Sequence, residues 1–267
     1  RGSVGVACFL ASAAGACRCD AMLQSRASVQ RVMGVYLLVS AAVFAVTRLE
    51  DLPAVGRYVH LAVAAIFLLT TVRLSRRDPS HYGVALGGLL EPADDGRPAG
   101  PLGLFDLARA LRKAMPSALI ELGVAASVAA VVFPLYTIGY YAWTEPAGAF
   151  ALALPTNVAS FVLAQLIVVA LPEEAFFRGY VQTSLSDVER RRVRFVGAEL
   201  APVSWLAQAI LFAGIHFIVD PQPARLAVFF PALLFGWLRA WRGGIGAAMA
   251  LHAMSNLYSE ILARSWL

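Results

Sequence analysis

The feature that most constrains the fold is a series of long apolar runs separated by short polar connections. A helix of about 20 apolar residues crosses about 30 Å of hydrocarbon, and only helices or closed barrels satisfy every backbone polar group there. No ten-residue segment alternates with strand period, which argues against a barrel. The sequence therefore predicts an all-α, polytopic transmembrane helical bundle of about seven spans. The runs lie at about 32–47, 58–74, 115–143, 157–181, 202–219, 225–241 and 244–263.

The distribution of charge predicts an orientation and excludes one class of partner. Only 15% of the 267 residues are charged, which is few for a soluble domain. The net charge is +5, but the basic residues gather in connections such as 75–113 and 187–194, whereas 144–156 and 219–224 have none. By the positive-inside rule this pattern orients the chain in a lipid bilayer with a cytoplasmic N-terminus, and we expect no nucleic-acid partner. Lys113 is the only lysine, which suggests a GC-rich bacterial genome and hence the inner membrane.

Three parts are predicted along the chain. Residues 1–30 are read as a tail or a signal-like or mis-started segment, with all three cysteines and no function. Residues 31–114 hold two spans and a basic connection, whose stretch LFDLARALRKAM has the spacing of a helix lying on the membrane surface. Residues 115–267 form the core, with Pro134 interrupting its first span.

The start of the last apolar run, RGGIGAAMALH, is rich in small residues at spacings of three and four. Small residues allow two helix backbones to approach closely, so we expect this helix to pack tightly on a neighbour. The residues concerned are Gly243, Gly246, Ala247 and Ala250.

Ionisable residues within an apolar run are costly in a membrane and mark functional sites. The stretch VVALPEEAFFRGYVQ places Glu174 and Arg178 four residues apart, the favourable order for an ion pair on one helix face. Glu173 points about 100° away from Glu174, which leaves its carboxylate free to face a cavity. A solvated cluster at the membrane surface is the simpler alternative for these three residues.

Two further polar groups stand in apolar runs. Phe212 and His216 are one helical turn apart in LFAGIHFIV, and His252 and Asn256 are one turn apart in LHAMSN. Each alone is more readily a packing residue or an interhelical hydrogen bond, and His60 is a fourth isolated case. A carboxylate and a histidine can activate water, while a histidine and an asparagine can stabilise an oxyanion. Together the groups make a complete hydrolytic set.

In this order, the boxes EEAFFR (173–178), FAGIH (212–216) and HAMSN (252–256) resemble the CPBP family of glutamic intramembrane proteases, which includes the CAAX prenyl endopeptidases. The resemblance implies that Glu173 activates the attacking water and that His216 positions or deprotonates it. It implies that His252 and Asn256 stabilise the oxyanion, with Glu174 and Arg178 as a supporting ion pair and Phe212 beside them.

The resemblance implies an intramembrane endopeptidase that needs no cofactor. An earlier view of the family as metalloproteases leaves zinc open as an alternative, since two histidines and a glutamate can hold this metal. The substrate expected is a membrane-anchored protein or peptide. A myxosortase-like role in removing C-terminal sorting tails, pheromone maturation and bacteriocin immunity all stay open, as does the oligomeric state.

Two other functions stay open from the sequence. A non-catalytic membrane binder, such as an immunity or scaffold protein, could use the same polar cluster to hold a partner. A transporter would show broken helices in paired halves, and Pro134 is one strong breaker within a run.

The predicted spans place two of the site residues at unequal depths. With a fourth span ending at 181 and a fifth starting at 202, Glu173 and His216 would differ in depth by about 9 Å. We expect either the fourth helix to continue past 181 or the fifth to start nearer the surface.

Overall fold

The computed structural model describes residues 26–86 and 104–266, and in this part of the chain the architecture is a bundle of long helices. Helices occupy all seven predicted positions. Six of them are long and apolar enough to cross a membrane, and these six run over Arg26–Thr47, Gly56–Ser75, Ala108–Thr144, Val158–Val188, Pro202–Val219 and Pro223–Arg242. The seventh is α9 (Gly246–Ser265). This is the all-α, polytopic helical bundle that the sequence predicts.

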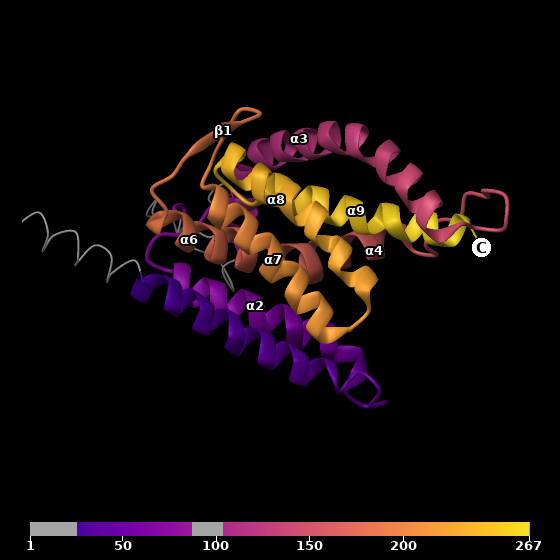
Figure 1. Cartoon of the computed structure of the whole chain (residues 1–267), viewed down its shortest axis with the longest axis horizontal. Coiled ribbons are helices and arrows are strands. Elements are labelled where there is room, and N and C mark those ends of the chain that lie inside the picture. The colour runs from indigo at the N-terminus through magenta and orange to yellow at the C-terminus, as the bar shows by residue number, and fades with distance from the viewer. Residues whose placement is uncertain (1–25, 87–103, 267) are drawn as a thin grey trace, which may run out of the picture.

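The helix Arg26–Thr47 and α2 (Val59–Ser75) form an antiparallel pair along one side of the bundle (Figure 1). The short turn η1 (Gly56–Tyr58) precedes α2. This pair packs on the core through aromatic residues. Phe67 of α2 lies 5.3 Å from the Phe176 ring, and the Tyr36 hydroxyl donates a 3.0 Å hydrogen bond to the Leu211 carbonyl. The predicted N-terminal part therefore contacts the predicted core directly.

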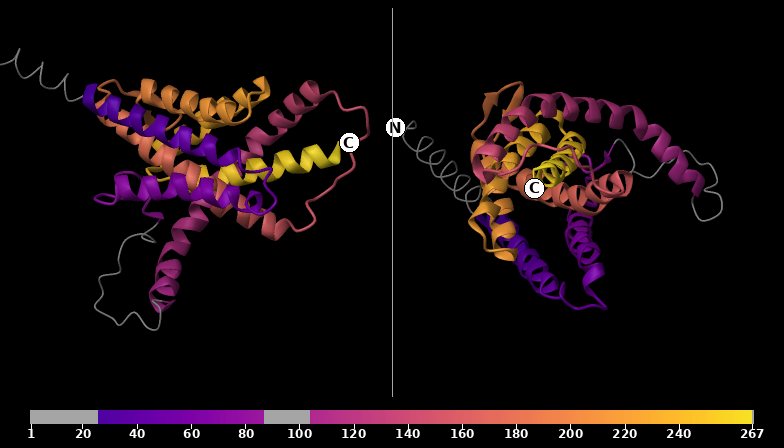
Figure 2. Two further views of the ribbon diagram at one scale, coloured as in Figure 1. Left: turned by 90° about the horizontal axis from the view of Figure 1, so that it is seen from below. Right: turned by 90° about the vertical axis from the view of Figure 1, so that its right-hand side faces the viewer.

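Helix α3 (Leu104–Thr144) is longer than predicted and continuous. The stretch LFDLARALRKAM forms its first turns, so it is not a separate surface helix. Pro134 does not interrupt the third helix either, and Pro116 also lies within it. Figure 2 shows α3 crossing the other helices at a steep angle. The predicted domain boundary at 114/115 falls inside this helix. Residues 1–25, with the three cysteines, lie outside the described residues.

The fourth helix spans Val158–Val188 as five consecutive segments with two different windings. Its α-helical parts alternate with two π-helical parts, which flank the turn that carries the adjacent glutamates. Such segments concentrate at functional sites in proteins. The segments are α4 (Val158–Ala164), η4 (Gln165–Ala170), α5 (Leu171–Glu174), η5 (Ala175–Gln182) and α6 (Thr183–Val188).

A short hairpin of β1 (Val193–Phe195) and β2 (Ala198–Leu200) follows, within a connection for which no strand was predicted. Its turn residues Val196 and Gly197 both have positive φ, 42° and 76°, as a two-residue type I′ turn requires. Valine is unusual at such a position, so the turn carried no clear sequence signal.

Helix α7 (Pro202–Val219) has the predicted bounds, and the turn η6 (Pro223–Val228) leads into α8 (Phe229–Arg242). Gly243 ends α8 in the left-handed conformation, with φ 73°. The small residues that follow let α9 lie against α3, as predicted. Gly246 is the tightest point, because an added Cβ would lie 3.0 Å from Glu121 Cγ. Ala247, Ala248 and Ala250 are buried.

Candidate active site

A buried ion pair forms the centre of the site. Arg178 Nη1 donates a 3.0 Å hydrogen bond to Glu174 Oε1, and both side chains are 0% exposed. The Arg178 guanidinium lies over the ring of Phe212, 4.3 Å from its centroid, and 5.1 Å from that of Phe235. A cation over an aromatic face is stabilised by the ring quadrupole. The predicted i, i+4 pair is therefore present, buried rather than solvated at a surface.

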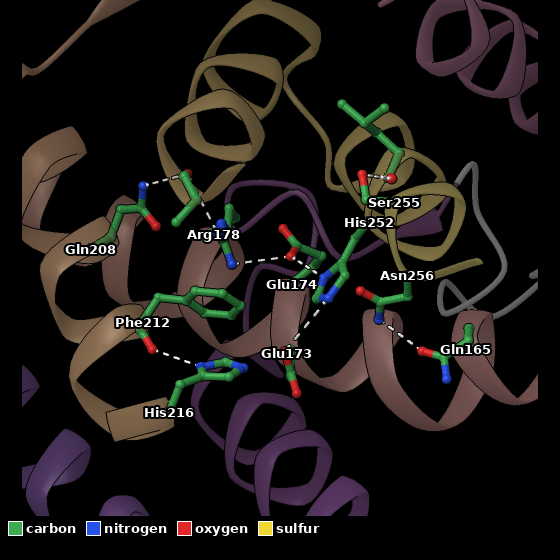
Figure 3. Close-up of polar contacts among 12 residues, drawn as sticks. Gln165, Glu173, Glu174, Arg178, Gln208, Phe212, His216, His252, Ser255 and Asn256 are labelled. Carbon is green, nitrogen blue, oxygen red and sulfur yellow. Dashed lines mark hydrogen bonds and ion pairs between the residues drawn. The ribbon is translucent and has the colours of Figure 1, made fainter. Parts of the chain in front are cut away.

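His252 of α9 lies between the two adjacent glutamates (Figure 3). Its Nδ1 is 2.8 Å from Glu174 Oε1, and its Nε2 is 3.8 Å from Glu173 Oε2. Because the carboxylate of an ion pair only accepts hydrogen bonds, we assign the proton on Nδ1 to this bond. The ring also stacks on Phe235, with centroids 5.0 Å apart and planes at 15°. These contacts fix the imidazole with Nε2 directed at Glu173.

Glu173 is the carboxylate that the ion pair does not use. Its side chain is 15% exposed, and its Oε2 atom is buried without a hydrogen-bond partner among the described residues. A buried carboxylate oxygen without a donor is unfavourable unless water or a ligand satisfies it. Glu173 thus has the free acceptor that a general base requires.

His216 of α7 is oriented by its own helix. Its Nδ1 lies 2.8 Å from the Phe212 carbonyl oxygen, which can only accept, so Nδ1 carries the proton and Nε2 is left for other partners. In Figure 3 the ring points from α7 toward the region of Glu173. The structure gives Glu173 its direct contact with His252, whereas the sequence associated it with His216.

Asn256 lies one turn beyond His252 on α9 and bonds to a residue that the sequence reasoning missed. Its Nδ2 donates a 2.7 Å hydrogen bond to Gln165 Oε1, at the start of η4. Gln165 is an intramembrane amide eight residues before Glu173. Its polarity within an apolar run was the one signal that could have identified it. The bond holds the Asn256 side chain on the fourth helix.

The extended fourth helix removes the predicted difference in depth. It ends at Val188, 15 residues after Glu173, while His216 lies 14 residues after the start of α7 at Pro202. At 1.5 Å per residue these depths are about 22 and 21 Å. The first of the two expected solutions is correct: the helix continues past residue 181.

His60 does not join the site. Its Nε2 lies 4.0 Å from Glu50 Oε1, and the two side chains are 74% and 59% exposed.

The described residues offer no set of metal ligands. Among residues 26–86 and 104–266, no group of three His, Cys, Asp or Glu side chains is placed to hold a metal ion. No step below uses a metal.

Comparison with known proteins gives one family match. Residues 155–258 match the family model described as Rce1-like, type II CAAX prenyl endopeptidase. The match spans the fourth helix, α7, α8 and most of α9, and it contains all three boxes. No curated protein and no solved structure matches the chain. The region from residue 155 to residue 258 is thus similar to the Rce1-like type II CAAX prenyl endopeptidases, which supports the resemblance to the CPBP family.

Proposed function

We propose that the protein is an intramembrane endopeptidase that cleaves a membrane-anchored protein or peptide with a water activated by Glu173. The observation that carries the proposal is that the adjacent carboxylates of Glu173 and Glu174 have different partners. Glu174 is neutralised by Arg178, while Glu173 keeps a buried, unbonded oxygen beside His252 Nε2. A carboxylate in such a position can take a proton from water.

In the proposed reaction, Glu173 removes a proton from water as the oxygen attacks the scissile carbonyl carbon. The carbonyl π electrons move to its oxygen, and Asn256 donates its second Nδ2–H to the resulting oxyanion. His252 donates to it from Nε2 as the imidazolium, since its Nδ1 proton stays bonded to Glu174. The oxyanion then collapses, the C–N bond breaks, and the proton held by Glu173 passes to the departing amine. His216 Nε2 positions the water, and the Glu174–Arg178 pair holds His252 in place.

The test is cleavage of candidate membrane-anchored substrates in a deletion strain complemented with wild type, Glu173→Gln or His216→Ala. Glu260→Gln serves as the control, because Glu260 lies on α9 in a partly exposed pair with Arg264. Each protein is quantified in membranes. We expect full-length substrate to accumulate with the two site variants and to be processed with the control.

Normal processing by Glu173→Gln would contradict the proposal. It would favour a non-catalytic membrane binder, since the amide is isosteric and preserves most contacts.

A further inference from the structure

A polar pocket lies beside the C-terminal end of the fourth helix, the end opposite Gln165. It has a volume of about 210 Å³, and its lining includes Gln182, Thr183, Asp187, Ser204 and Arg239. Arg239 Nη2 spans one wall, donating hydrogen bonds to the His81 carbonyl at 2.9 Å and to Thr183 Oγ1 at 3.1 Å. A pocket with carboxylate, guanidinium and hydroxyl groups favours water over lipid. It borders the connection that the charge pattern assigns to the cytoplasm.

Next to this pocket are the buried side-chain amides of Gln182 and Gln208, and each has one polar atom without a hydrogen-bond partner among the described residues. Gln182 Nε2 donates to the Gly236 carbonyl at 2.9 Å, and Gln208 Nε2 donates to the Ala232 carbonyl at 3.0 Å. The Oε1 atoms of both glutamines are buried without a hydrogen-bond partner among the described residues. Leaving a buried acceptor unsatisfied is unfavourable, and ordered water is the usual partner of such atoms.

Gly236 brings the two amides to the same place. A Cβ at this position would lie 2.5 Å from Gln208 Nε2 and 2.9 Å from Gln182 Oε1. A larger residue here would force the ends of both glutamine side chains to move. The unsatisfied oxygens thus belong to one small polar region, which begins at the lining of the pocket.

The same line of polar groups reaches the candidate active site. The Ala232 carbonyl accepts hydrogen bonds from both Gln208 and Arg178, the latter at 3.3 Å. Two further atoms at this end, Arg178 Nε and Glu174 Oε2, are also buried without a hydrogen-bond partner in the described chain. Figure 3 shows the side chains of Gln208 and Arg178 directed toward the same region between their helices and α8. Gln182 and Gln208 therefore connect the pocket to the ion pair, and each of these four side chains has a buried atom suited to bind water.

We propose that this line is a hydrated path that supplies water from the pocket to the active site. It runs from Gln182 past Gly236 and Gln208 to Arg178 and Glu174. Water is scarce in hydrocarbon, so a hydrolase whose site is surrounded by lipid needs a polar route to it. The role as a supply rests on the proposed function, whereas the hydration of the path can be measured without any proteolysis.

The hydration is tested by placing single cysteines along the path and treating the protein with Ag⁺, a small ion that enters aqueous paths. Ag⁺ reacts with thiolates, and a thiol forms a thiolate where it is in contact with water. Gln182→Cys and Gln208→Cys are made after replacing Cys8, Cys17 and Cys19 with serine. Ala209→Cys is the control, because Ala209 neighbours Gln208, is 0% exposed and lies in the apolar core. The thiols that remain free are labelled after denaturation. We expect both glutamine positions to react at least tenfold faster than position 209. Equal rates at 208 and 209 would overturn the proposal.

The path is then blocked with Gly236→Val, or with Gly236→Ala if valine prevents folding. We expect position 208 to lose its reaction with Ag⁺ while position 182, on the pocket side, keeps it and so reports an intact fold. With the natural glutamines present, the same block lowers kcat and leaves KM unchanged. Gly139→Ala is the control, because its Cβ meets nothing within 4 Å.

The outcomes separate the two proposals. A blocked path with unchanged kcat would overturn the supply role. A wild-type protein without proteolysis would refute the proposed function but leave the thiol result standing.

Discussion

Glu174 and His252 are 78 residues apart in the chain and share a 2.8 Å hydrogen bond at the centre of the bundle. The same Glu174 oxygen accepts a 3.0 Å bond from Arg178. One buried atom therefore fixes both the cation of the fourth helix and the imidazole of α9. The neighbouring Glu173 is held by no such bond, so the two carboxylates are expected to respond differently to the same substitution.

Glu174→Gln is expected to destabilise the protein strongly. Removing one partner of a buried ion pair leaves an unpaired charge, which costs about 3–5 kcal/mol. Glu173→Gln is expected to abolish cleavage with little change in stability, because its Oε2 makes no hydrogen bond in the described chain. Thermal unfolding of both variants in the same detergent checks this difference. Equal shifts in Tm would contradict the separate roles given to the two glutamates.

Gln165 is expected to act as a positioning residue through its 2.7 Å bond to Asn256. Gln165→Leu should lower kcat and leave KM nearly unchanged, because the misplaced Asn256 amide would stabilise the oxyanion less. The measurement is a double-mutant cycle with Asn256→Ala. The double variant should be no slower than Asn256→Ala alone, since residues that act as a unit are non-additive. Additive losses would show that Gln165 acts elsewhere.

Chelation is expected to leave the activity unchanged. The described residues hold no group of three metal donors, and the proposed chemistry uses only the carboxylate and imidazole groups. Purified protein is assayed after dialysis against a strong chelator, with its zinc content measured in parallel. A loss of cleavage that added zinc restores would refute the metal-free mechanism.

Stability should depend on pH through Glu189, which caps the start of α7. It accepts hydrogen bonds from the Val203 and Ser204 backbone amides at 3.0 and 2.8 Å, and from the Ser204 hydroxyl at 2.7 Å. Burial alone raises the pKa of Glu189, but the bonds from Ser204 and Val203 together with the charge of Arg192 outweigh it, so the pKa lies below its usual value. A depressed carboxyl pKa stabilises the fold above the unfolded pKa, and this contribution is lost as pH falls through the folded pKa.

The matched variant is Glu189→Gln, which removes the charge at every pH. We expect wild type to be more stable by about 1 kcal/mol near neutral pH, the usual value of a helix cap. The advantage should disappear in acid below about pH 4, where the free carboxyl group of glutamate protonates. Unfolding curves of both proteins between neutral and acidic pH measure it. An advantage independent of pH would contradict the charged cap.

Much of the fold could be predicted because membrane helices are encoded by local apolar length. The bounds of α7 were predicted to the residue, and the Glu174–Arg178 pair followed from their spacing on one helix. Continuation of the fourth helix past residue 181 was one of two expectations, but its end at Val188 could not be predicted, because its last turns are polar. The bond from His252 to Glu174 also carried no local signal, since it depends on how two distant helices pack. Gln165 and Gln208 were missed because each is a single polar residue between apolar neighbours, and a single residue makes no repeating pattern.

The two π-helical segments make the number of residues in the fourth helix as important as their identity. The turn Leu171–Glu174 lies between η4 and η5, so the directions of its carboxylates depend on the wider winding at both sides. Each residue of an α-helix advances by 100°, so deleting one residue from either segment would rotate Glu173 and Glu174 out of line with Gln165 or Arg178. Substitutions that preserve polarity leave this alignment intact, whereas insertions and deletions between residues 165 and 178 do not. The spacing along this helix thus sets the directions in which Glu173 and Glu174 point, a property that no single side chain carries.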